Sequence, residues 1–77
     1  MNFKTYFCPQ TGHVNYLKKP GEKIKKGEEI YNLTWFDPSK AEALETTIVA
    51  LEDATVINHC PSGNVLNGME VYQVLED

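Results

Sequence analysis

The segment that decides the fold of this 77-residue chain is Ile24-Lys25-Lys26-Gly27-Glu28-Glu29-Ile30-Tyr31-Asn32-Leu33. It returns near the C-terminus as Val65-Leu66-Asn67-Gly68-Met69-Glu70-Val71-Tyr72-Gln73-Val74. Each copy has an aliphatic residue, a glycine three positions later, and aliphatic residues three and six positions after that glycine. The glycine lets the backbone reverse, and the Val, Ile and Tyr that follow favour a strand. The pattern therefore predicts a turn followed by a strand, present twice.

The repeat extends towards the N-terminus of each copy. Phe7-Cys8-Pro9-Gln10-Thr11-Gly12-His13-Val14 aligns with Val49-Ala50-Leu51-Glu52-Asp53-Ala54-Thr55-Val56, and Gly21 aligns with Gly63. One residue is then missing from the second copy, near Glu22. One copy alone cannot bury its apolar face, but two copies related by an approximate twofold axis can cover each other.

We therefore expect one all-β domain over residues 1–77. Its first repeat covers about residues 4–36, a tip segment covers about 37–45, and the second repeat covers about 46–75. Val, Ile, Tyr and Thr dominate the segments that we expect to be strands. These segments are Lys4–Cys8, Gly12–Lys18, Glu28–Phe36, Thr46–Leu51, Ala54–Cys60 and Met69–Leu75.

The tip segment contains the part of the chain with helix-forming chemistry, Asp37-Pro38-Ser39-Lys40-Ala41-Glu42-Ala43-Leu44. Ser39 and Glu42 have the spacing of a capping box, and good helix formers surround them. The sequence therefore predicts a hairpin tip with one or two helical turns.

Composition and charge exclude several classes of function. The formal net charge is −4, with eleven acidic residues against seven lysines and no arginine, which argues against nucleic-acid binding. Five of the lysines lie between Lys18 and Lys26; Glu22, Glu28 and Glu29 accompany them, so we interpret the run as a solvated loop rather than a docking patch for an acidic partner.

No run approaches the ~18 apolar residues of a membrane helix, and residues 1–10 lack the apolar core of a secretory signal. We expect a soluble, cytoplasmic domain that binds no membrane.

Four residues could suggest a zinc site: Cys8, His13, His59 and Cys60. Their spacing fits no local zinc motif, and adjacent residues of a strand point to opposite faces. We expect a buried Cys8, surface positions for His13 and His59, no metal ligands and no disulfide framework. No combination of nucleophile and base can be argued, so we assign no catalytic residues to the chain.

The doubled pattern resembles the biotinyl/lipoyl-type domain, which is a flattened barrel-sandwich hybrid. Two segments carry the resemblance, Cys8-Pro9-Gln10-Thr11-Gly12-His13-Val14 and Pro20-Gly21-Glu22-Lys23-Ile24-Lys25-Lys26-Gly27-Glu28-Glu29-Ile30. The second copy departs from the family pattern, because Leu51 replaces its usual Pro and Ala54 its usual Gly. Since Ala resists positive φ, we expect a different turn at the start of that copy.

Carrier domains of this fold hold biotin or lipoate on a Lys at the tip of the hairpin that joins the copies. The joining segment here has one such residue, Lys40, without the flanking motif of either carrier and with longer arms. A carrier with Lys40 as attachment site is therefore the alternative interpretation. Periplasmic adaptors of the same fold carry a coiled coil at the tip, and Thr34 to Thr46 is too short for one.

Longer joining segments are typical of the C-terminal domain of the succinylglutamate desuccinylase/aspartoacylase family, which this chain resembles in pattern and spacing. The resemblance implies a non-catalytic accessory domain of a zinc-dependent amidohydrolase. Its partner would be the preceding catalytic domain, which holds the zinc, so this chain needs no cofactor of its own.

The candidate contact surface for that partner consists of Trp35, Phe36, Pro38 and Leu44. Exposed aromatic rings at the tip would indicate a surface that meets another domain. Packed rings would instead close the end of the barrel. The sequence leaves these two interpretations of Trp35 and Phe36 equally open.

Overall fold

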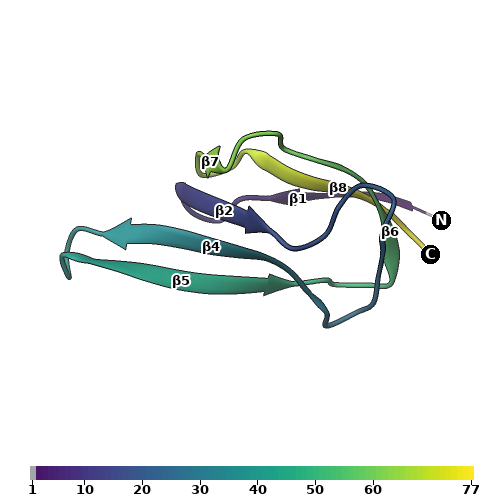
Figure 1. The fold of residues 1–77 in the computed structure, drawn as a ribbon, viewed down its shortest axis with the longest axis horizontal. Coiled ribbons are helices and arrows are strands. Elements are labelled where there is room, and N and C mark those ends of the chain that lie inside the picture. The colour runs from purple at the N-terminus through teal and green to yellow at the C-terminus, as the bar shows by residue number, and fades with distance from the viewer. Residues whose placement is uncertain (1) are drawn as a thin grey trace.

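The regular structure of the chain consists of strands alone in the computed structural model, which describes residues 2–77 (Figure 1). The strands are β1 (Asn2–Phe7), β2 (Gly12–Tyr16), β3 (Lys23–Ile24), β4 (Glu29–Asp37), β5 (Glu42–Val49), β6 (Ala54–His59), β7 (Asn64–Val65) and β8 (Glu70–Glu76). They form two four-stranded antiparallel sheets, and no closed barrel forms within this part of the chain. The predicted all-β class is confirmed.

The order of the strands follows the sequence repeat. One sheet has the order β1-β8-β6-β3 and the other β5-β4-β2-β7. In the alignment of the two copies, β2 corresponds to β6, β3 to β7 and β4 to β8, while β1 and β5 are the strands that enter each copy. Replacing every strand by its counterpart converts one sheet order into the other. Each sheet therefore takes strands from both copies, so neither copy forms a sheet on its own.

The core lies between the two sheets and is built from aligned pairs of residues. The pairs are Cys8 and Ala50, Val14 and Val56, Ile24 and Val65, Ile30 and Val71, Tyr31 and Tyr72, and Leu33 and Val74, all of them buried. Tyr6 and Ala54 complete the buried cluster. The alternation of apolar and polar residues along each strand is what directs one set inwards.

The two short strands β3 and β7 were not predicted, since a two-residue pairing leaves no periodic signal. The predicted helix at the tip is wrong. Residues 42–44 belong to β5, which pairs with β4 as far as Asp37 opposite Glu42. The hydroxyl of Ser39 donates to the Asp37 carboxylate at 2.6 Å instead of capping a helix. One or two isolated helical turns are marginal in water, whereas the extended arm gains cross-strand pairs such as Trp35 with Leu44.

The glycine at the start of the first copy has a steric role. Gly12 does not have a positive φ, so the φ preference of Ala gives no reason for a different turn at Ala54. A Cβ on Gly12 would collide with the carbonyl oxygen of Thr34 and crowd Trp35 at 3.1 Å. The counterpart Ala54 is accommodated as a buried core residue.

Candidate functional site

The β4–β5 hairpin projects from the two-sheet body, at the end opposite to the chain termini (Figure 1). Strand β2 pairs with β4 only from Tyr31 to Thr34, whereas β5 pairs with β4 up to Asp37. The last three residues of β4 and the first three of β5 therefore form a two-stranded ribbon. The projection contributes to the elongated shape of the molecule, which measures 42 × 21 × 17 Å.

The turn of the hairpin, residues 38–41, is held by Asp37. Its carboxylate accepts hydrogen bonds from the amide of Ser39 at 2.9 Å and from the Ser39 hydroxyl, and its carbonyl accepts one from the amide of Lys40 at 3.2 Å. Ala41 has a φ of 52°, which costs an Ala about 1–2 kcal/mol. Lys40 is exposed at the apex of this turn.

The four residues of the candidate contact surface divide between the two faces of the hairpin. Trp35 is half-buried against the core and donates a hydrogen bond from Nε1 to the Thr46 hydroxyl at 3.3 Å. Leu44, directly opposite Trp35, is also half-buried. Phe36 on the other face is 60% exposed, and Pro38 is exposed. Trp35 is therefore the packed ring that closes the end of the sheets, and Phe36 is the exposed ring that could meet another domain.

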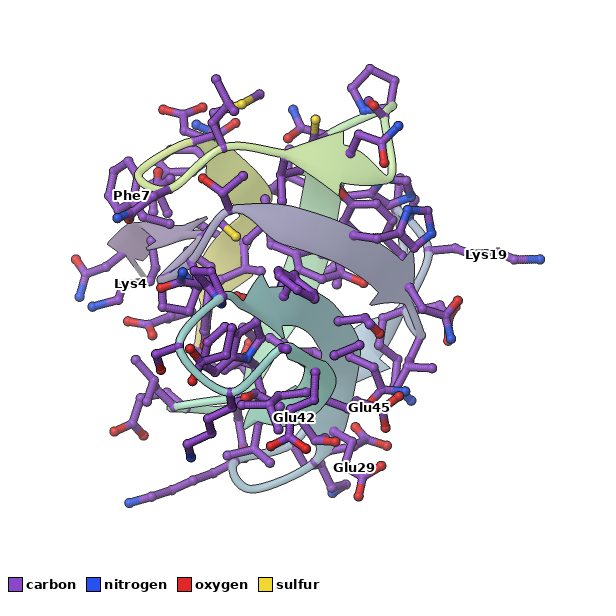
Figure 2. The ribbon with its side chains drawn as sticks, turned by 90° about the vertical axis from the view of Figure 1, so that its left-hand side faces the viewer. Lys4, Phe7, Lys19, Glu29, Glu42 and Glu45 are labelled. Atoms are coloured by element: carbon purple, nitrogen blue, oxygen red, sulfur yellow. The ribbon has the colours of Figure 1, made fainter. Side chains whose placement is uncertain are left out.

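Charge on the hairpin is mainly negative. Glu29, Asp37, Glu42 and Glu45 are opposed by Lys40 alone, and Figure 2 shows Glu29, Glu42 and Glu45 on the same side of the molecule. Asp37 and Glu42 lie nearest to Phe36 along the hairpin, whereas Glu29 lies at the other end of β4, opposite Val49. A partner that covers the hairpin tip would need an apolar surface to meet Phe36 and basic groups beside it to meet the carboxylates.

In the lysine-rich loop before β4, one lysine side chain is paired with an acid of the same loop. Lys18 forms an ion pair with Glu28 at 3.0 Å, and this contact, with the hydrogen bond from the Lys25 amide, holds the pKa of Glu28 below its ordinary value. The amide of Lys26 donates to Asp53 at 2.8 Å. Backbone amides of the loop are thus bound both by its own Glu28 and by Asp53 of the second copy.

The four residues that could suggest zinc are not brought together. Cys8 is buried, as predicted, and its thiol donates to the Gln10 carbonyl at 2.8 Å. His13 is exposed, with Nδ1 3.3 Å from the Asn64 side chain. The surface position predicted for His59 is wrong, because its ring is half-buried and stacks on Tyr16 at 4.2 Å. Within residues 2–77 no three His, Cys, Asp or Glu side chains could together hold a metal ion.

An aromatic cluster that the sequence did not reveal lies beside His59. Tyr16 meets Tyr72 edge-on at 5.5 Å, and the Tyr72 hydroxyl lies within 3.2 Å of backbone atoms of Lys18 and Ile30. Burial raises the pKa of Tyr31 to about 12 and raises that of Tyr16 further. These phenols therefore stay neutral and act as packing groups. The identical Tyr31 and Tyr72 in the two copies were the signal that could have indicated the cluster.

The described part of the chain contains no helix long and apolar enough to cross a membrane.

Comparison with known proteins gives matches to solved structures. No family model and no curated protein matches the chain. It is similar to a protein from Shewanella frigidimarina NCIMB 400 assigned as a succinylglutamate desuccinylase/aspartoacylase, with 27% identity and a TM-score of 0.82 over 97% of this chain. It is also similar to a protein from Shewanella amazonensis SB2B assigned to the same family, with 28% identity and a TM-score of 0.80 over 96% of this chain. In both cases the chain spans only 20% of the length of the solved protein, so it resembles one module of a larger desuccinylase/aspartoacylase-type protein.

Proposed function

We propose that this chain is the non-catalytic accessory domain of a zinc-dependent amidohydrolase of the succinylglutamate desuccinylase/aspartoacylase type. One observation carries the proposal: almost the whole chain superimposes on one fifth of each of two solved proteins assigned to that family. The remaining four fifths of such a protein would supply the zinc ligands and the catalytic Glu. In this proposal the chain is a C-terminal, biotinyl/lipoyl-like barrel-sandwich module. The two sheets support that fold, because each strand of one sheet has its counterpart from the other copy at the same position of the other sheet.

The accessory role also accounts for the chemistry of the chain itself. Its buried groups are neutral core residues, and among the described residues no set of metal ligands is assembled. The projecting hairpin offers an arm with an exposed Phe36 and an exposed Pro38 near its end. In our proposal this arm, with Trp35 and Leu44 supporting it from the inner face, packs on the catalytic domain. There it narrows access to the active site and excludes water from it. The assembled protein would act in the cytoplasm.

Reconstitution tests this function. The hydrolase polypeptide that adjoins residues 1–77, in the same or a neighbouring reading frame, is assayed for release of amino acids from N-acyl amino acids with and without the chain. We expect no hydrolysis and no bound zinc for the chain alone, and a change in KM or kcat of the hydrolase when the chain binds. Absence of an adjoining hydrolase, or of any binding to it, contradicts the proposal.

The alternative, a biotin or lipoate carrier, is favoured by one observation. The structure places Lys40 in the exposed turn that joins the two copies, which is where carriers of the resembling fold hold their cofactor. Intact mass after co-expression with biotin and lipoate ligases distinguishes the two functions. A biotinyl or lipoyl increment that disappears in Lys40→Ala would establish the carrier, and an unmodified mass is the outcome we expect.

A further inference from the structure

Three apolar side chains are exposed around the turn between β7 and β8. Leu66 is 62% exposed, Met69 37% and Phe7 58%. Phe7 lies opposite Glu70 in the β1–β8 pair, and the next amide, that of Cys8, donates to the carbonyl of Met69 at 2.7 Å. The three residues thus belong to adjoining backbone segments, and we call them the apolar turn surface.

The other copy of the repeat shows that the fold does not require two of these side chains, those of Leu66 and Met69, whereas the counterpart of Phe7 is the exposed Val49. The equivalent turn has Lys25 and Glu28 in place of Leu66 and Met69. Its backbone bond from the Glu28 amide to the Lys25 carbonyl measures 2.9 Å, and the bond from the Met69 amide to the Leu66 carbonyl measures 3.0 Å. One protein therefore builds the same turn from charged residues at one site and from apolar residues at the other. Exposed apolar area is unfavourable in water, so the apolar version calls for a role outside the fold.

The apolar turn surface lies at the end of the molecule that a partner of the hairpin would meet. In Figure 1 the turn leaving β7 lies in the same half of the molecule as the projecting hairpin, away from both termini, whereas the charged turn leads into β4 in the opposite half. Figure 2, which looks onto the hairpin end, shows Phe7 on one side and Glu42 and Glu45 on the other.

We propose that Phe7, Leu66 and Met69 form a second contact surface for the catalytic polypeptide, in addition to the hairpin. This inference rests on the proposed function. We identify the partner as the catalytic polypeptide because four fifths of each similar solved protein lies outside the module and is joined to it in one chain. The partner's surface is expected to be apolar where it meets the turn and basic where it meets the carboxylates of the hairpin.

The internal repeat supplies a variant that isolates the side chains from the backbone. Leu66→Lys/Met69→Glu gives the apolar turn the side chains of the charged turn. The control, Lys25→Leu/Glu28→Met, makes the reverse change and gives the charged turn the side chains of the apolar one. Binding of each purified variant to the adjoining hydrolase polypeptide is measured by calorimetry. We expect the first variant to bind about 30-fold or more weaker than the unmodified chain, as for the loss of an interface hot spot. The control should bind within about threefold, because its sites lie at the opposite end.

The outcomes separate this inference from the proposed function. If the unmodified chain does not bind the hydrolase at all, the proposed function fails and the inference fails with it. If the unmodified chain binds and Leu66→Lys/Met69→Glu binds equally tightly, the inference alone is overturned. Sedimentation of the unmodified chain by itself gives a further check, and we expect a monomer. A dimer abolished by Leu66→Lys/Met69→Glu would assign the surface to a second copy instead and would also overturn the inference.

Discussion

The turn before β4 and the turn before β8 have the same backbone and different side chains. Gly27 and Gly68 have φ values of 86° and 87°, and their amides donate to the carbonyls of Ala50 and Cys8, each at 2.8 Å. In one turn the Lys25 amide is bound by the Glu28 carboxylate at 3.0 Å; in the other the Leu66 amide lies 3.1 Å from the Met69 sulfur. The fold therefore specifies the glycine and the backbone bonds, and leaves the remaining side chains open to other uses.

The shared core beneath the two turns should show the largest effects. Leu33→Ala and Val74→Ala remove equivalent buried side chains. We expect Leu33→Ala to lower the free energy of unfolding by about 3 kcal/mol, and Val74→Ala to lower it by somewhat less because fewer atoms are lost. Urea unfolding followed by circular dichroism measures both. If Leu33→Ala lowered the free energy of unfolding and Val74→Ala left it unchanged, the two copies would not contribute equivalently to the core.

The glycines of the two turns should show intermediate and equal effects. Gly27→Ala and Gly68→Ala each place a Cβ at a positive φ, while the space around both sites is open. Each substitution should therefore cost about 1–2 kcal/mol from backbone strain alone, and the two costs should agree within about 0.5 kcal/mol. A cost at one glycine only, in the same urea titration, would show that the turns differ in more than their side chains.

Lowering the pH should reduce the stability contributed by the charged turn slightly and leave that of the apolar turn unchanged. The pKa of Glu28 is lowered in the folded chain by its contacts with Lys18 and Lys25. Its contribution to stability is therefore present above the ordinary carboxyl pKa and is lost as pH falls through the folded value. Glu28→Gln should flatten this part of the stability profile below about pH 4.5. Met69→Gln in the other turn is the matched control and should leave the profile unchanged, so an equal flattening in both variants would contradict the assignment.

Exchange of the turn side chains should have the smallest effect on folding. We expect Leu66→Lys/Met69→Glu to unfold within about 0.5 kcal/mol of the unmodified chain, because the equivalent turn already folds with these residues. A loss of more than about 1.5 kcal/mol in urea unfolding would show that Leu66 and Met69 serve the fold, and would remove the reason to assign them to a partner.

The hairpin tip shows where prediction from sequence failed. Ser39 and Glu42 have the spacing of a helix start, yet the structure extends β4 and β5 up to a four-residue turn. Local spacing carried no information on the strand pairing that competes with a helix. The sequence likewise could not decide between the packed Trp35 and the exposed Phe36, because adjacent strand residues alternate and the covered face depends on the second sheet.

The sequence by itself determined the two glycine turns and the apolar core positions that follow them, because glycine spacing and apolar periodicity are local properties that recur in both copies. It also contained the difference between Lys25-Lys26-Gly27-Glu28 and Leu66-Asn67-Gly68-Met69. The tertiary structure alone decided which strands pair, that each sheet draws on both copies, and which apolar side chains stay exposed. Those outcomes depend on contacts between residues far apart in the chain, and such contacts leave no periodic trace in the sequence.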